Sequence, residues 1–132
     1  MTAYANRGHI ARAALEAAAW QSREVVDAAN AVADVPFTEL RVDGGMTANE
    51  LLMQFQADVL GVPVIRPEVT ETTALGAALL AGVGAGVWSQ DAVVRGWRER
   101  ARFEPSMGND ERESLLVDWH RAVVRAKGWV SG

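Results

Sequence analysis

The residues with the clearest chemical potential form a short polar run around a glycine pair. Asp43 precedes Gly44 and Gly45, and Asn49 follows shortly after them. Glycine permits positive φ and lets a ligand approach the main chain closely, while free N–H groups at a helix start favour a phosphate or a polar ring edge. Asn49 adds a side-chain amide for a purine or a ribose. The run indicates nucleotide binding by Gly44, Gly45 and Asn49. A tight turn that needs positive φ is the commoner reason for such a pair, so both interpretations stay open on pattern alone.

The elements on either side of the glycine pair would place it where α/β proteins bind ligands. The alternation of Leu40 and Val42 predicts a short strand over residues 38–43. Thr47 and Glu50 have the spacing of a capping box, so a helix is expected from about Ala48. The glycine pair would then lie at the carboxyl end of a strand, the usual ligand position in such folds.

A second strand is expected close behind this helix. Gly61 is a plausible C-terminal cap of the helix, and a strand over residues 62–65 should stop at Pro67. Two strands joined through a helix form a parallel pair. The sequence therefore predicts an α/β fold.

The remaining chain is expected to be mainly helical. A long helix should run from Arg7 to about Ala33, and an Ala- and Gly-rich buried helix should follow a cap at Thr72 or Thr73. Residues 91–109 have little pattern and are expected to form a connector, followed by an amphipathic helix that ends at Gly128. The long helix should pack through a narrow apolar face made of Ile10, Ala14, Ala17, Ala18, Val25 and Ala28. With only two confident strands, the inventory predicts an incomplete α/β layer.

Composition excludes several classes of partner. The 132 residues carry a net charge of −4 and no cysteine, which argues against a nucleic-acid surface, a disulfide framework and a thiolate metal site. The uncharged run over residues 72–90 is dominated by small side chains, so no membrane partner is expected. The first residues lack a signal-peptide pattern. A cytoplasmic protein with small-molecule or protein partners is the expectation.

Other candidate chemical groups receive ordinary structural interpretations. His9 and His120 lack companions at metal-ligand spacing, so no metal ligand is assigned on this chain. Glu68 and Glu71 flank a turn and are expected to be solvated or to cap a helix, so no catalytic residue is assigned. The five tryptophans, which we expect to act as core or interface anchors, are Trp20, Trp88, Trp97, Trp119 and Trp129.

Longer motifs resemble one enzyme family across essentially the whole chain. The stretches concerned are residues 9–16, Arg41 to Asn49, 52–58, Arg66 to Val69, 71–78, 102–105 and 119–129. Together they resemble the C-terminal part of the glycerol kinases, members of the FGGY carbohydrate kinases. Related pentulose and hexulose kinases share the glycine cluster and the Ala-Leu-Gly-Ala-Ala element, so a related sugar kinase is a second possibility.

The resemblance implies a fold, a reaction and a set of contacts. It implies that residues 1–132 are the C-terminal nucleotide-binding lobe of an actin-like, ribonuclease H-like ATPase fold. The complete enzyme would transfer the γ-phosphoryl group of ATP, with Mg²⁺, to glycerol. By resemblance, Gly45 and Asn49 match adenine-nucleotide contacts, Gly44 supports their turn, and Asp43 is a turn or capping acid rather than a magnesium ligand.

The resemblance also implies what this chain lacks. The family's catalytic aspartate, glycerol-binding residues and N-terminal phosphate loop lie upstream of the matched region, and Met1 falls inside a family signature whose tail is His9 to Glu16. We therefore expect an N-terminally truncated or separately encoded segment that is inactive alone and meets glycerol only with an N-terminal lobe. The alternative is a stand-alone, non-catalytic nucleotide-binding or interaction module, which pairs with a partner lobe or forms a homo-oligomer.

Overall fold

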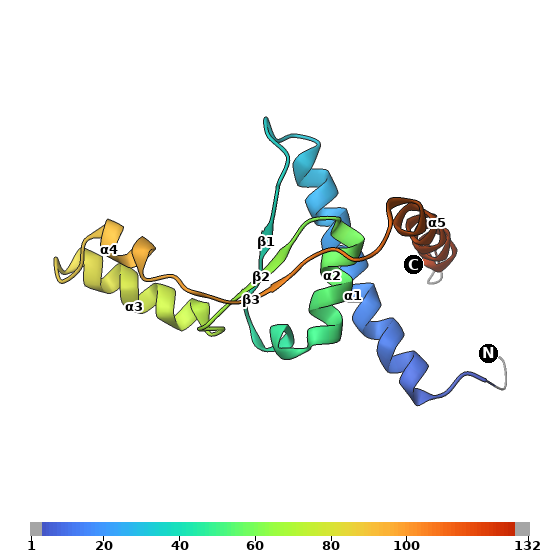
Figure 1. The fold of residues 1–132 in the computed structure, drawn as a ribbon, viewed down its shortest axis with the longest axis horizontal. Helices are drawn as coiled ribbons and strands as arrows, with labels where there is room; N and C mark the ends of the chain where they lie inside the picture. The colour runs from blue at the N-terminus through green and yellow to red at the C-terminus, as the bar shows by residue number, and fades with distance from the viewer. Residues whose placement is uncertain (1–3, 129–132) are drawn as a thin grey trace.

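The computed structural model describes residues 4–128 and shows helices on both sides of a small central sheet (Figure 1). The elements are α1 (Arg7–Asn30), β1 (Leu40–Arg41), the 3-10 helix η1 (Gly45–Ala48), α2 (Glu50–Leu60), β2 (Val64–Pro67), α3 (Thr72–Gly84), α4 (Gln90–Arg95), β3 (Glu99–Phe103) and α5 (Asn109–Ala126). In Figure 1, α3 and α4 extend to one side of the strands, while α1, α2 and α5 gather on the other.

The sheet has the strand order β1-β2-β3. β1 and β2 are parallel, with Leu40 opposite Val64, so the predicted strand–helix–strand unit and the α/β class are confirmed. The prediction of a featureless connector over residues 91–109 was wrong, because that segment forms α4 and then β3, which runs antiparallel to β2. β3 escaped prediction because it is a charged edge strand in which only Ala101 and Phe103 are half-buried.

The core lies between α1, α2 and the sheet. Its buried apolar side chains are Ala19, Trp20, Leu52, Met53, Ala57, Val59, Val64 and Ile65. The face predicted for α1 was wrong, since Ile10 and Val25 are exposed while Ala19 and Trp20 are buried. The reason is length: α1 has 24 residues and α2 has 11, so α2 covers only the middle of α1.

The predicted burial of the Ala- and Gly-rich helix was also wrong. No residue of α3 is buried, and Leu80 is 74% exposed. A helix that is apolar all round becomes buried only when other layers cover it, and among residues 4–128 α3 packs closely against no other element and shares only a groove with α4. No helix of the described chain is long and apolar enough to cross a membrane.

The ends of α1 and α2 are capped by neighbouring residues, whereas the start of α3 has no side-chain cap. Asn6 caps α1 by accepting from the Gly8 and His9 N–H groups, and His9 Nδ1 accepts from the Asn6 N–H. His9 is therefore part of the N-terminal cap of this helix. The predicted Thr72 or Thr73 cap was wrong, because α3 begins at Thr72 after Glu71, which makes no side-chain cap bond. Gly61 ends α2 with φ 71°, as expected.

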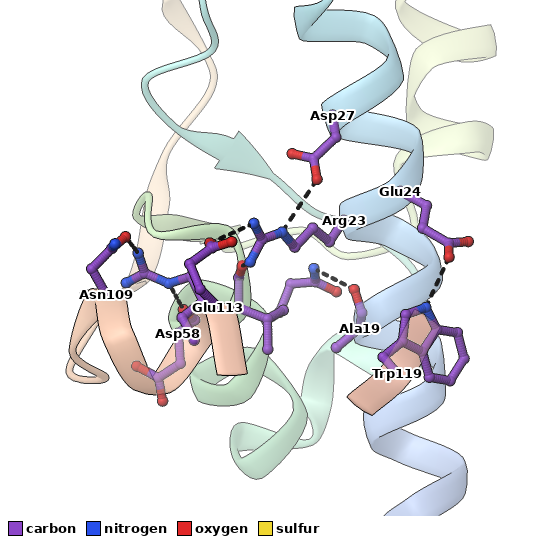
Figure 2. A network of polar contacts seen from close by, with 11 residues as sticks. Ala19, Arg23, Glu24, Asp27, Asp58, Asn109, Glu113 and Trp119 are labelled. Atoms are coloured by element: carbon purple, nitrogen blue, oxygen red, sulfur yellow. Dashed lines mark hydrogen bonds and ion pairs between the residues drawn. The ribbon is translucent and has the colours of Figure 1, made fainter. Parts of the chain in front are cut away.

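Polar contacts hold α5 against α1 and α2 (Figure 2). Arg23 of α1 donates to the Val59 carbonyl and to Glu113 of α5, each at 2.9 Å. Trp119 of α5 stacks on Trp20 with ring centroids 6.4 Å apart and donates from Nε1 to Glu24. These two tryptophans are thus anchors of the core.

The other tryptophans differ in their surroundings. Trp88 and Trp97 line the groove along α3 and are 46% and 38% exposed, and Trp129 lies outside the described residues.

Candidate functional site

The glycine pair forms a turn immediately after β1. The pairing of this strand continues to Val42, whose N–H donates to the Ile65 carbonyl at 3.0 Å. The chain then reverses at Gly44, with φ 86° and ψ 169°, and enters η1 at Gly45. The turn therefore lies at the carboxyl end of a strand in a parallel pair, the position expected for a ligand site.

The two glycines have different conformational roles. Gly44 occupies a backbone region that is open essentially to glycine alone. Gly45 has no positive φ, and a Cβ built on it would meet nothing within 4 Å. The tight-turn explanation thus accounts for Gly44 but not for Gly45, whose α-carbon faces open space.

The predicted capping box was wrong, because η1 separates Thr47 from the helix start. The Thr47 hydroxyl donates to the Gly44 carbonyl at 2.7 Å. Asn49 is the N-cap of α2 instead, and its Oδ1 accepts from the Leu52 N–H at 3.0 Å. α2 therefore begins at Glu50. Asn49 is exposed, and within residues 4–128 no hydrogen bond is donated by its side-chain amide.

The loop between β2 and α3 holds the other side of the turn. The Gly44 N–H donates to the Thr70 carbonyl at 2.9 Å, and the Thr72 hydroxyl donates to the Asp43 carboxylate. Asp43 is thus hydrogen-bonded to Thr72, the first residue of α3. Sequence reasoning missed the contacts of Thr70 and Thr72 with the turn, because these contacts join segments that are distant along the chain.

Arg66 of β2 contacts the 3-10 helix that begins at the glycine pair. Its side chain is largely buried, and Nη1 donates to the Thr47 carbonyl at 2.7 Å. In the sequence, Arg66 and Pro67 belong to a stretch that resembles the family, and no separate role was predicted for Arg66. A charged residue inside a short, otherwise buried strand was the signal that could have marked it.

Carboxylates near the turn do not form a metal cluster in the described part of the chain. Within residues 4–128, no group of three or more His, Asp or Glu side chains is arranged to hold a metal ion. Glu68 and Glu71 are both exposed. Gly44, Gly45 and Asn49 are brought together on one turn, and this arrangement can offer main-chain surface and one side-chain amide to a polar ligand.

An apolar groove begins beside the turn. It is shared by α3, α4 and the end of β1, and Arg41 and Thr72 belong to its lining. The Arg41 guanidinium lies 4.5 Å from the centroid of the Trp97 ring, a cation–π contact. Both side chains of this contact belong to the lining of the groove.

Comparison with known proteins identifies the fold. Residues 1–85 match the family described as "FGGY family of carbohydrate kinases, C-terminal domain". The structure superposes on Plasmodium falciparum glycerol kinase with ADP at a TM-score of 0.81 and 35% identity, over 98% of this chain and 26% of that one. It also matches xylulose kinase from Rhodospirillum rubrum at a TM-score of 0.73 and 26% identity, over 95% of this chain and 26% of that one.

The sheet, the glycine turn and the helices are thus those of a carbohydrate-kinase C-terminal domain, which confirms the expected part of an actin-like lobe. The chain belongs to the FGGY family of carbohydrate kinases. It is 60% identical over 131 residues to glycerol kinase of Renibacterium salmoninarum, a match that covers 98% of this chain and 26% of that protein. Glycerol kinase of Dechloromonas aromatica is 58% identical over 132 residues, covering 99% of this chain and 26% of that protein. The chain spans about a quarter of the length of these relatives.

Proposed function

We propose that this chain is the C-terminal, adenine-nucleotide-binding lobe of an ATP-dependent glycerol kinase, which converts glycerol and ATP to glycerol 3-phosphate and ADP. The observation that carries the proposal is the exposed Gly45–Asn49 turn at the end of a parallel strand. This turn lies in a chain 60% identical to a glycerol kinase and similar in structure to a glycerol kinase with ADP.

The residues of the turn fit an adenosine. Gly45 leaves space at its α-carbon, so a ring or ribose can approach the main chain without meeting a side chain. Asn49 accepts the Leu52 N–H through Oδ1, which leaves its amide N–H groups to donate to the ligand. Gly44 contributes the reversal that presents both residues.

Bound ATP would supply the transferable phosphoryl group, and Mg²⁺ would neutralise charge on its phosphates. Since Mg²⁺ is commonly held by one or two carboxylates together with substrate phosphates, the described residues need supply no cage for it, and we assign it no ligand here. The role of this chain is then to bind and orient the adenosine. The catalytic aspartate, the glycerol contacts and a phosphate loop belong to the remainder of the enzyme.

The proposal extends to domain organisation, location and partners. Residues 1–132 act as one lobe that pairs with an N-terminal lobe in the cytoplasm, where ATP is available, and homo-oligomers of the complete kinase are compatible with this role. A stand-alone module is the second candidate, but the high identity to glycerol kinases favours the kinase lobe.

A chimeric enzyme tests the proposal. Residues 1–132 would replace the matching quarter of the Renibacterium glycerol kinase, and glycerol-dependent ADP formation would be measured. We expect turnover, with ATP affinity lowered about tenfold, or about 1.4 kcal/mol, by Gly45→Ala and glycerol affinity unchanged. A folded chimera that has no turnover, while the 132-residue chain alone binds ATP, would favour the stand-alone module.

The Asn49 role needs a variant that keeps the helix cap. Asn49→Ser retains an oxygen that can accept the Leu52 N–H, whereas Asn49→Ala removes both cap and amide. We expect Asn49→Ser to weaken ATP binding by about one hydrogen bond, roughly 0.5–1.5 kcal/mol, at nearly unchanged stability. If Asn49→Ser binds ATP with wild-type affinity, Asn49 only caps α2 and makes no hydrogen bond to the nucleotide.

A further inference from the structure

We infer that Arg66 is a positioning residue for the nucleotide site, because its buried guanidinium holds the turn that presents Gly45 and Asn49. The inference rests on the proposed function for the identity of the ligand. The geometry of the contact stands independently of it. Arg66 lies on β2, in the middle of the sheet, and is 9% exposed.

The key contact reaches the middle of η1. Arg66 Nη1 donates to the Thr47 carbonyl at 2.7 Å, a charge-assisted bond of the stronger kind. Thr47 in turn donates its hydroxyl to the Gly44 carbonyl at 2.7 Å and its N–H to the same oxygen at 3.1 Å. The guanidinium therefore fixes Thr47, and Thr47 fixes the glycine that reverses the chain.

The same guanidinium is held from two other directions. Its central carbon lies 5.5 Å from the centroid of the Phe103 ring of β3, and Nη2 lies 3.6 Å from Glu50 Oε1 in the first turn of α2. The Glu50 side chain is 77% exposed, so solvent screens this ion pair and it contributes little. The bond to the buried Thr47 carbonyl is the contact that matters.

The chemistry calls for arginine rather than another cation. A planar guanidinium can lie over an aromatic ring while one edge donates to a carbonyl, and a lysine ammonium cannot do both in the same way. Arg66 Nε is buried and lacks a hydrogen-bond partner among the described residues. Leaving a buried donor unpaired is unfavourable, and Nη1 rather than Nε makes the contact with the turn.

The test uses the complete 132-residue chain. Amide hydrogen exchange measures how often the turn opens and needs no ligand. Arg66→Lys is expected to speed exchange of the Thr47 and Asn49 amides at least about tenfold, while amides in the second half of α2 keep wild-type rates. It is also expected to raise the dissociation constant for ATP by a similar factor. Unchanged turn exchange, or equal acceleration in the turn and in α2, would overturn the inference.

Two control variants separate the Thr47 contact from simple charge effects. Glu50→Gln removes the ion pair but keeps the bond to Thr47, so turn exchange and ATP affinity should stay within about twofold of wild type. Arg102→Lys changes an exposed β3 arginine whose pKa is raised above its ordinary value, chiefly by the hydrogen bond that Glu104 accepts. It should leave the turn unaffected, and an effect equal to that of Arg66→Lys would count against a specific role.

The design also distinguishes failure of the proposed function. If the wild-type chain and the chimera both fail to bind ATP, the nucleotide assignment is wrong, whereas the exchange experiment still decides whether Arg66 holds the turn. Arg66→Met would leave the Thr47 carbonyl without its buried donor and is expected to lower the melting temperature. For that reason Arg66→Lys is the decisive variant, because it retains the charge but lacks the planar guanidinium that reaches the Thr47 carbonyl while it lies over the Phe103 ring.

Discussion

Asp58 Oδ1 accepts a hydrogen bond from the Ser106 N–H at 2.6 Å, which ties α2 to the loop between β3 and α5. The same oxygen lies within bonding distance of the Ser106 hydroxyl, the Met107 N–H and Gln54 Nε2. Asp58 is 8% exposed. A single buried carboxylate therefore organises the approach of the chain to α5.

Removal of this carboxylate should be strongly destabilising. Asp58→Ala leaves several partly buried donors without this acceptor, and we expect the free energy of unfolding to fall by about 2 kcal/mol. Asp58→Asn keeps one acceptor oxygen and should lose less. Urea denaturation of both variants measures the difference. A loss below about 1 kcal/mol in Asp58→Ala would show that the loop is held by other contacts.

The stability of the fold should depend on Arg23 far more than on its ion-pair partner Glu113. Glu113 is 51% exposed, so Glu113→Gln should change stability by less than about 1 kcal/mol. Arg23→Met also removes the donor to the Val59 carbonyl of α2, so we expect a clearly larger loss in the free energy of unfolding, measured by urea denaturation. Equal losses in the two variants would show that the bond to Val59 adds nothing.

The C-terminal cap of α2 leaves no room for a side chain. Gly61 has φ 71°, and a Cβ there would lie 2.7 Å from Arg112 Nη1. Gly61→Ala should lower stability by at least about 1 kcal/mol, because positive φ is unfavourable for alanine and Arg112 must also shift.

Gly84→Ala is the matched control for Gly61→Ala. Gly84 is the last residue of α3, and a Cβ there would meet nothing within 4 Å, so alanine there should be neutral or stabilise the helix by up to about 0.5 kcal/mol. Thermal melting compares the two variants, and a neutral Gly61→Ala would contradict the prediction.

Alanine substitution of the two glycines of the candidate site should affect the stability of the ligand-free protein differently. Gly44→Ala forces a non-glycine residue to φ 86° and ψ 169°, at a cost of about 1–3 kcal/mol. Gly45→Ala should leave the melting temperature near wild type, because its Cβ enters open space. Melting curves recorded without nucleotide decide this. A large loss in Gly45→Ala would mean that Gly45 serves the turn rather than the ligand.

The isolated 132-residue chain should show no glycerol-dependent ATP turnover. It spans 26% of a related glycerol kinase, and phosphoryl transfer needs both substrates positioned together with a base. A coupled ADP-release assay on contaminant-free protein, with and without glycerol, is the measurement. Turnover above background that survives further purification would show that the chain holds a complete active site.

Most local elements and the position of the candidate site can be predicted from the amino-acid sequence alone. The glycine pair marks a chain reversal because glycine enters positive φ readily, as Gly44 does. The apolar pattern around residues 51–65 defines a helix and a strand whatever else is present. Longer motifs identified the family, as the match over residues 1–85 shows. Such signals depend only on residues that are close along the chain, so they can be recognised without the three-dimensional structure.

The side chains that contact the glycine turn could be identified only from the three-dimensional fold. Arg66 meets the Thr47 carbonyl because β2 lies beneath η1, and Asn49 rather than Thr47 caps α2 because η1 intervenes. The buried face of α1 followed from where α2 crosses it, and the exposure of α3 followed from what covers it among residues 4–128. Each of these outcomes depends on contacts between segments distant in the chain, for which helical or strand periodicity carries no information.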